Sequence, residues 1–153
     1  MTDISVIMPA LNEEANIARA IRSVLDAFDL MHISGELIVV NDASTDRTRE
    51  IVEMEIRSDS RIKIINNPRS ENIGGAFWNG VETAAGELTV LVPGDGETIP
   101  SEIMRYHSLM SSVDIVVPFV CNREVRSLFR NFLSIVYRLI IDATFMINLN
   151  YTN

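Results

Sequence analysis

Cysteine and basic residues are both scarce in this chain. Cys121 is the single cysteine among 153 residues. It excludes an internal disulfide framework and fits a reducing compartment, where we expect it to be a small buried apolar residue. The 13 basic residues against 21 acidic ones give a formal net charge of −8. This balance argues against a protein that binds nucleic acid through bulk electrostatics.

A long apolar run and a secretory signal are also missing. No stretch reaches the roughly 18 consecutive apolar residues of a transmembrane helix. The first three residues carry no basic side chain, and the apolar run after them stops at Pro9, unlike the pattern of a signal peptide. We therefore expect a cytoplasmic protein.

Two common phosphate-binding signatures do not occur. A dinucleotide fingerprint needs G-x-G-x-x-G after the first strand, where this chain has PALNEE. A P-loop needs a glycine-rich run that ends in Lys-Ser or Lys-Thr, and the chain has none. These absences exclude the two most familiar nucleotide-binding folds.

Apolar strand patterns alternate with helical patterns along the chain. Hydrophobic residues make up 47% and charged residues 22%, which are values of a globular protein. We expect strands at 4–8 (closed by Pro9), 37–40 (after a break at Gly35), 62–65, 87–92 and 114–119. We expect helices from Asn12–Glu14 to Phe28, through 51–56, through 76–85 with Gly86 as C-cap, at 101–112, and from Val125 onward.

This alternation predicts an α/β protein with a mostly parallel central sheet and helices on both faces, as one domain over residues 1–153. In such sheets ligands bind outside the carboxyl ends of the strands. Polar pairs follow the first, second and fourth strands: Asn12–Glu13, Asn41–Asp42 and Asp95 with Glu97. Three such clusters at one edge are difficult to attribute to turn chemistry alone.

The segment 87–97, ELTVLVPGDGE, is the most informative stretch. It is expected to be a mostly buried strand that ends at Pro93. Gly94 and Gly96 lack a Cβ, so the backbone there can approach a bulky anion. If the segment stays extended, Asp95 and Glu97 project to the same side and suit Mg²⁺ with a diphosphate. The alternative is an acidic surface turn, since the same residue types are common in turns.

Three segments together resemble a known family. SVIMPALNEEANI, ELIVVNDASTDRT and NIGGAFWNGVETAAGELTVLVPGDGE are similar to the nucleotide-sugar-binding half of family 2 glycosyltransferases, which have the GT-A fold. The dolichyl-phosphate mannose and polyprenyl-phosphate glucose synthase branch is the most similar. The resemblance runs from about Ser5 to Phe119, with the motifs in the family's order and spacing.

The resemblance implies a donor site for a nucleotide-diphosphate sugar. Pro9, Leu11 and Glu13 would line the base and ribose pocket. Asp42 would contact the base, although a helix cap or turn residue is the alternative for it. Asn41 replaces the first acid of the family's loop.

A glycine-rich segment would approach the diphosphate. The resemblance implies this role for Gly74, Gly75, Asn79 and Gly80. The alternative explanation is that these glycines are needed only for helix packing.

The resemblance also implies a divalent metal, Mg²⁺ or Mn²⁺. Asp95 would be the catalytic metal ligand and would bind the donor, and Glu97 would be a further metal ligand. The chain departs from the family at Pro93, where most members have the first acid of the metal motif. Either the metal is bound more weakly, through Asp95, Glu97 and the donor phosphates alone, or the chain has lost its activity.

The implied reaction transfers a sugar to an acceptor with inversion. An alcohol acceptor needs a general base. The two candidates are Asp114 and Asp142, and we assign them structural roles, as a cap and as a solvated or paired residue. The sequence therefore shows no convincing base. Arg123, Arg126 and Arg130 would share one helix face and could hold a polyprenyl phosphate at the cytoplasmic membrane surface. A solvated helix face is their alternative.

The final apolar segment, FLSIVYRLIIDATFMINLNY, predicts a chain that is truncated within its acceptor-binding part. Residues 1–119 would be the donor half and 120–153 the start of the acceptor part. An exposed apolar helix would favour homo-oligomers or a membrane surface. Two other functions stay open: a donor-binding module without transferase activity, and a nucleotidyltransferase, which would need a glycine-rich basic signature in place of PALNEE.

Overall fold

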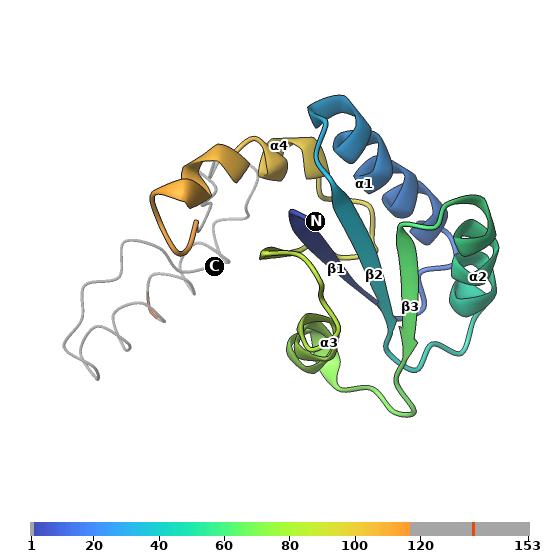
Figure 1. Cartoon of the computed structure of the whole chain (residues 1–153). Helices are drawn as coiled ribbons and strands as arrows, with labels where there is room; N and C mark the ends of the chain where they lie inside the picture. Colours follow the sequence, from blue (N-terminus) through green and yellow to red (C-terminus); the bar gives the residue numbers. More distant parts are fainter. Residues whose placement is uncertain (1, 117–135, 137–153) are drawn as a thin grey trace. The chain divides into compact units, whose positions relative to one another are not determined.

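Figure 1 shows the computed structural model, which describes residues 2–116 and residue 136. The chain divides into two compact units, Met1–Leu109 and Met110–Asn153. The first unit contains the whole four-stranded sheet and helices α1 to α4. No helix in the described part of the chain is long and apolar enough to cross a membrane.

The sheet consists of four parallel strands in the order β3-β2-β1-β4. The strands are β1 (Ile4–Ala10), β2 (Gly35–Asn41), β3 (Ile62–Asn66) and β4 (Leu88–Leu91). In register, Val6 of β1 lies opposite Leu37 of β2 on one side and Val90 of β4 on the other. The sheet grows outward from β1 through β2 to β3, and β4 then joins the other side of β1. The predicted parallel α/β architecture is confirmed.

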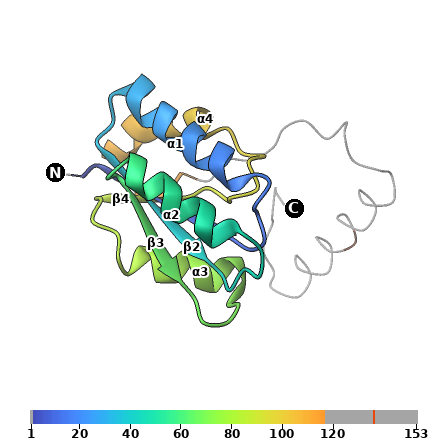
Figure 2. The same ribbon diagram turned by 90° about the vertical axis from the view of Figure 1, so that its right-hand side faces the viewer.

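Helices cover both faces of this sheet, as predicted (Figures 1 and 2). Helices α1 (Ile17–Met31) and α2 (Thr48–Ser58) lie on one face, and α3 (Asn72–Val81) lies on the other. The short helix α4 (Pro100–Met104) packs against α1, and a 3₁₀ helix, η1, covers His107–Ser111.

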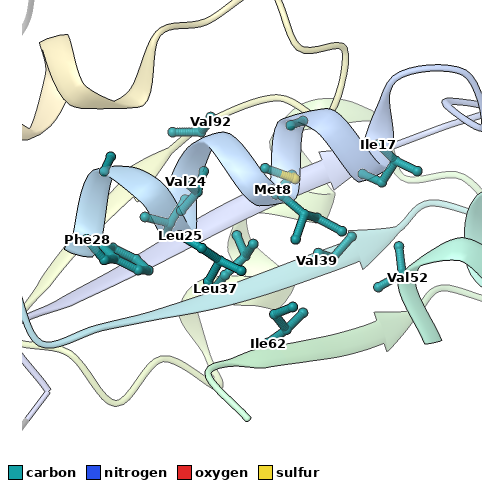
Figure 3. Packing of buried hydrophobic residues seen from close by; sticks show 14 of the residues in the cluster. Met8, Ile17, Val24, Leu25, Phe28, Leu37, Val39, Val52, Ile62 and Val92 are labelled. Carbon is teal, nitrogen blue, oxygen red and sulfur yellow. The ribbon is translucent and has the colours of Figure 1, made fainter. Parts of the chain in front are cut away.

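Alternate residues of the central strands form two separate hydrophobic clusters. Figure 3 shows the larger one, in which Met8, Leu37 and Val39 pack beneath Val24 and Phe28 of α1. The smaller cluster contains Ile7, Ile38, Val40 and Ala76 on the α3 side. Burying a side chain the size of Phe28 stabilises a fold by about 1.5–3 kcal/mol. Both faces of β1 and β2 are therefore apolar, as is typical of a covered parallel sheet.

Two predicted strand boundaries are wrong. Pro9 does not end β1, which continues to Ala10 with Pro9 opposite Val40. The backbone N–H of Gly94 donates to the Pro9 carbonyl at 3.0 Å, so the backbone of Pro9 faces the β4 side. The nitrogen of Pro9, which carries no hydrogen, faces the same side and lies beyond the end of β4. The hydrogen bonds between β1 and β2 are therefore complete. Gly35 begins β2 and does not break the chain before it.

Two predicted helix boundaries are also wrong. Helix α1 begins at Ile17, because Asn12 has a left-handed backbone with φ of 58°. Helix α3 ends at Val81, before the predicted C-cap Gly86. A Cβ on Gly86 would lie 2.6 Å from the backbone nitrogen of Ser5, so this glycine is needed for a close approach to β1.

The segment after β4 differs from the expected long helix and fifth strand. Residues 101–112 divide between α4 and η1, and Leu109 N–H donates to the Tyr106 carbonyl at 3.0 Å, a 3₁₀ pattern. Of the predicted strand 114–119, the described residues 114–116 are not in a strand. Residues 117–119 and the helix expected from Val125 lie outside the described residues, except for the helical residue 136. Strand β4 is half-exposed and not mostly buried, with Leu91 37% exposed.

Candidate functional site

The loops that follow β1, β2 and β4 begin side by side at the carboxyl edge of the sheet. Backbone hydrogen bonds continue the pairing beyond the strands: Asp42 N–H donates to the Ala10 carbonyl at 2.9 Å and Gly94 N–H to the Pro9 carbonyl at 3.0 Å. The strand order reverses at β1, which lies between β2 and β4. In parallel sheets ligands bind at such a reversal, outside the carboxyl ends of the strands.

The loop after β1 is joined to the loop after β2. Asn12 N–H donates to Ser44 Oγ at 3.0 Å, and Asn12 Oδ1 accepts a hydrogen bond from Thr45 N–H at 2.8 Å. Glu13 N–H donates to Thr48 Oγ1 at 2.8 Å. The polar residues that predicted a helix start are therefore used between two loops, which is why α1 begins later.

Asp46 and Glu14 strengthen the same connection. Asp46 Oδ2 accepts from Glu14 N–H at 3.0 Å, and Glu14 Oε2 accepts from Arg47 N–H at 3.0 Å. Asp46 Oδ1 also accepts from Thr48 N–H at 2.9 Å. Burial by itself would raise the pKa of Asp46, but the hydrogen bonds from Thr48 and Glu14 outweigh it and hold the pKa below its ordinary value.

Asp42 is buried, with 3% of its surface exposed. Its Oδ1 accepts from Asn67 Nδ2 at 2.8 Å and from Glu71 N–H at 2.9 Å, and its Oδ2 accepts from Ser70 Oγ at 2.6 Å. Burial raises the pKa of this carboxyl, yet the hydrogen bonds from Ser70, Asn67 and Glu71 lower it further than burial raises it. The carboxylate thus binds the β3–α3 loop, which is distant in sequence, and neither caps α2 nor forms a local turn.

Asn79 extends these contacts into α3. Its Nδ2 donates to Asn67 Oδ1 and to Glu71 Oε2, both at 3.0 Å. Asn67 and Ser70 were not predicted as part of the site. The only signal in the sequence is an Asn-rich and Pro-containing loop directly after a strand that neighbours β2.

The segment Pro93–Glu97 forms a turn. Glu97 N–H donates to Asp95 Oδ1 at 3.0 Å, and the backbone of Gly96 is left-handed with φ of 71°. The extended conformation that would place both carboxylates on the same side is therefore wrong. Asp95 is half-buried and Glu97 is exposed at the edge of the sheet.

The two glycines of this turn contact α1 and the end of β1. A Cβ on Gly94 would lie 2.9 Å from Ile17 Cδ1 and 3.1 Å from Ala10 Cβ. A Cβ on Gly96 would lie 2.9 Å from Nη2 of Arg19. Packing explains Gly94, whereas the left-handed backbone explains Gly96, beside which the guanidinium group of Arg19 lies. Helical spacing places Arg19 on the polar face of α1, and its side chain is exposed.

The glycines of α3 differ from one another in their surroundings. A Cβ on Gly80 would lie 2.3 Å from Ile7 Cγ2, and a Cβ on Gly75 would lie 2.6 Å from Glu71 Cβ. A Cβ on Gly74 would have no neighbour within 4 Å. Packing accounts for Gly80, whereas Gly74 presents an open backbone surface in the first turn of the helix.

The remaining predicted site residues lie at or after the end of β1. Pro9 is buried within the strand, Leu11 is 47% exposed, and Glu13 is half-buried. Glu13 Oε2 accepts from Asn16 Nδ2 at 3.0 Å. Arg123 and Arg126 lie outside the described residues.

Asp95 and Glu97 of the β4 turn are oxygen donors of the type that a divalent metal takes. Among the described residues, no group of three His, Cys, Asp or Glu side chains could hold a metal ion. Mg²⁺ usually takes one or two carboxylates and completes its shell with water and substrate phosphates. Asp95 and Glu97 fit that smaller donor set.

A parallel sheet with a reversal of strand order and polar loops at its carboxyl edge is the arrangement in which α/β proteins commonly bind ligands. Residues 5–147 match the model of Glycosyl transferase family 2. The chain belongs to this family.

Curated relatives include sugar transferases of lipid phosphates. Dolichyl-phosphate beta-glucosyltransferase ALG5D of Trichomonas vaginalis is 31% identical over 100 residues, which are 62% of this chain and 31% of the relative. Undecaprenyl-phosphate 4-deoxy-4-formamido-L-arabinose transferase of Aeromonas hydrophila is 29% identical over 124 residues, 79% of this chain and 38% of the relative. The chain therefore spans about a third of the length of these relatives.

Solved structures with a similar fold include a UDP complex and a mannosyltransferase. TarS of S. aureus in complex with UDP has a TM-score of 0.63 at 25% identity. The match covers 82% of this chain and 38% of the TarS chain. The mannosyltransferase PcManGT of Pyrobaculum calidifontis, in complex with GDP-Man and Mn²⁺, has a TM-score of 0.50 at 25% identity, covering 60% of this chain and 27% of its own. These likenesses confirm the predicted GT-A fold and family.

Proposed function

We propose that this chain forms the donor-binding part of a glycosyltransferase that moves a sugar from a nucleotide diphosphate to an acceptor. The observation that supports it most is the junction at the reversal of strand order. There the hydrogen bond from Gly94 to Pro9 holds the Asp95 turn beside the end of β1. Family membership adds the reaction class.

The proposed donor lies across the carboxyl edge of the sheet. Pro9, Leu11 and Glu13 line the base and ribose pocket, and Asp42 lies at the end of the neighbouring strand. The open backbone at Gly74, with Gly75 after it, faces the diphosphate. The 47% exposure of Leu11 and the open surface at Gly74 support this placement.

Asp95 and Glu97 are the proposed ligands of a divalent ion, Mg²⁺ or Mn²⁺, that the donor phosphates complete. When bound, such an ion supplies Lewis-acid stabilisation of the charge that develops on the leaving diphosphate. Pro93 contributes no side-chain ligand, so we expect the protein alone to hold the ion weakly. The attack of an acceptor oxygen on the anomeric carbon, with departure of the nucleoside diphosphate, inverts that centre.

A polyprenyl phosphate is the proposed acceptor class. Two relatives carry dolichyl phosphate or undecaprenyl phosphate in their names. A phosphate acceptor is already an anion at neutral pH and needs no general base. Arg123 and Arg126 are the proposed contacts for it, which would place the protein at the cytoplasmic face of a membrane.

Calorimetric titration tests the donor site. Purified protein is titrated with UDP, GDP and their sugar conjugates, each with and without Mn²⁺. We expect one diphosphate to bind in a metal-dependent manner, and Asp95→Ala to remove that dependence. Asp26→Ala, an exposed carboxylate in α1, is the matched control and should bind as the wild type does. Absence of binding by every nucleotide would refute the proposed function.

Pro93 favours a second candidate, a donor-binding module without transferase activity. An assay of donor hydrolysis or sugar transfer, in which the released nucleoside diphosphate is measured, distinguishes the transferase from the binding module. Binding without turnover would identify the module.

A further inference from the structure

We infer that Glu36 is a positioning residue: its carboxylate fixes the start of β4 and thereby the place of the Asp95 turn at the other end of that strand. The inference rests on the proposed function, because the place of this turn matters only if Asp95 takes part in donor binding. Glu36 lies near the amino end of β2, at the edge of the sheet opposite the candidate site. It therefore acts through β4 and does not touch the donor.

The carboxylate of Glu36 holds the connection between α3 and β4 against the two central strands. Its Oε1 accepts from Ser5 Oγ of β1 and from Ala85 N–H, both at 2.6 Å. Ser5 Oγ in turn accepts from Gly86 N–H at 2.9 Å. Ser5 is fully buried and Glu36 is 6% exposed, so leaving these groups unpaired would be costly. Two successive backbone amides ahead of β4 are therefore fixed by side chains of β2 and β1.

This connection leaves β4 no freedom to shift along β1. Only Glu87 lies between Gly86 and Leu88, the first residue of the strand. A Cβ on Gly86 would lie 2.6 Å from the backbone nitrogen of Ser5, so a side chain does not fit at this point. A shift of the strand would bring Ala85 or Glu87 there. The observed register is thus the one that places the glycine against β1.

The other contacts of β4 do not select one register. The strand pairs with β1 over four residues only, Leu88–Leu91 against Ile4–Ile7. Its apolar pattern continues to Val92, so a shift by two residues would still present Val90 and Val92 to the core. Main-chain hydrogen bonds are equally available in each register, since every residue other than proline carries the same donor and acceptor. The contacts at the start of the strand therefore distinguish the observed register from the others.

A shift of β4 would displace the candidate site directly. Strand residues rise about 3.3 Å each, so a two-residue shift would move the turn by about 7 Å. In the observed register, Gly94 N–H donates to the Pro9 carbonyl at 3.0 Å, which holds Asp95 beside the end of β1. A metal ligand must lie within about 0.2 Å of its ideal distance. The bonds of Glu36 at one end of β4 thus decide whether a metal ligand is in place at the other.

Lys63 of β3 pairs with the second oxygen of the same carboxylate. Its Nζ lies 2.6 Å from Glu36 Oε2, and its side chain is 52% exposed. This ion pair joins β3 to β2, so its loss should lower stability and leave the two hydrogen bonds at Oε1 in place. Lys63 therefore offers a matched control within the same network.

The test compares Glu36→Met and Ser5→Ala with the control Lys63→Met. Dissociation constants of UDP and GDP are measured with and without Mn²⁺, and melting temperatures are recorded. The ratio of the constants without and with Mn²⁺ reports how well the Asp95 turn holds the metal. A loss of stability that leaves the protein folded affects both constants alike and does not change the ratio.

We expect the ratio to fall about tenfold in Glu36→Met and about threefold in Ser5→Ala, and to stay unchanged in Lys63→Met. All three variants should melt at a lower temperature than the wild type. An unchanged ratio in Ser5→Ala overturns the inference even where Glu36→Met does not fold. An equal fall in Lys63→Met also overturns it, because the effect would then follow from general destabilisation.

Amide hydrogen exchange tests the positioning without a donor. The Gly94 amide should exchange about tenfold faster in Glu36→Met, and also faster in Ser5→Ala, than in the wild type. The Asp42 amide, which donates to the Ala10 carbonyl from the β2 side, is the internal control and should keep its wild-type rate. A wild type that binds no nucleotide refutes the proposed function. Unchanged exchange at Gly94 in both variants refutes the positioning role whatever the nucleotide result.

Discussion

Gly80 of α3 lies directly against Ile7 of β1, and a Cβ at this glycine would be 2.3 Å from Ile7 Cγ2. We expect Gly80→Ala to lower the free energy of unfolding by about 1–3 kcal/mol, because overpacking forces helix and sheet apart. Gly74→Ala is the control, since its Cβ would meet open space, and should be neutral or stabilising by up to about 1 kcal/mol. Urea denaturation measures both. Equal costs for the two variants would contradict the observed packing.

Because Gly74→Ala should leave folding intact, it can also be used to probe the donor site. A loss of nucleotide affinity in this variant, without a loss of stability, would place the diphosphate near the first turn of α3. Unchanged affinity would argue against the role that the family resemblance implies for Gly74.

Glu36 should make stability depend on pH. Burial raises its pKa, but Lys63 at 2.6 Å from Oε2, together with Ser5 and the Ala85 N–H, holds the pKa below the ordinary 4.5. The folded protein therefore binds fewer protons at this group than the unfolded chain does. The contribution of Glu36 is complete above the unfolded-state pKa and decreases as pH falls through the lower folded-state value.

The measurement is urea denaturation of wild type and Glu36→Gln between neutral and acidic pH. We expect Glu36→Gln to cost about 1–3 kcal/mol at pH 7, since a buried network loses its charge. The difference between the two proteins should shrink below the ordinary carboxyl pKa. A difference that stays constant across this range would show that the charge of Glu36 contributes nothing.

Arg19 and Gly96 should be only weakly coupled in their effects on the free energy of unfolding, because the Arg19 guanidinium is the exposed end of a flexible side chain and can move. Gly96→Ala would introduce a Cβ at 2.9 Å from Arg19 Nη2 and would also force alanine into a left-handed backbone at φ 71°. The backbone component costs about 1–2 kcal/mol. In the Arg19→Ala background the small steric component should disappear and the backbone component, which is most of the cost, should remain. Arg22→Ala, which removes the pairing of Arg22 with Glu55, is the control background and should leave the full cost of Gly96→Ala.

Metal binding should depend on the nucleotide. Asp95 and Glu97 offer two carboxylates, and no larger ligand group occurs in the described part of the chain. We therefore expect no saturable Mn²⁺ binding to the protein alone, and saturable binding once the nucleoside diphosphate is present. Electron paramagnetic resonance of free Mn²⁺ measures this. Tight Mn²⁺ binding without nucleotide would mean that other residues supply ligands.

Arg123 and Arg126 should separate acceptor use from donor binding. If they hold a lipid phosphate, Arg123→Ala together with Arg126→Ala should abolish sugar transfer to a polyprenyl phosphate and leave nucleotide affinity unchanged. Arg49→Ala together with Arg57→Ala, two exposed arginines of α2, is the control. Simultaneous loss of both functions, or of neither, would contradict the assignment.

The parallel sheet and the positions of its polar loops could be predicted because strand and helix patterns depend on local residue spacing. The wrong boundaries share a physical cause. Asn12 and Glu13 have the composition of a helix start, yet their backbone N–H groups donate to Ser44 and Thr48 in another loop. Gly86 looks like a helix cap, but the contact that requires a glycine is with β1.

The candidate site was predicted only in part for the same reason. Asp95 and Asp42 stand out because each follows a strand. Asn67 and Ser70 do not, since their importance depends on a carboxylate more than twenty residues earlier in the chain, as the hydrogen bonds to Asp42 show. Helical spacing places Arg19 toward solvent, where it is exposed, but says nothing of the turn that passes beside it.

The central position of β1 also sets an order of assembly. Strand β2 pairs with β1 after one intervening helix, whereas β4 pairs with β1 only after α2, β3 and α3 have been added. Contacts that are distant in sequence form late, because loop closure costs entropy before pairing repays it. During synthesis from the N-terminus, we expect β1, β2 and β3 to associate while one side of β1 is still unpaired. The turn that carries Asp95 would then be the last part of this edge to form, when β4 closes that side.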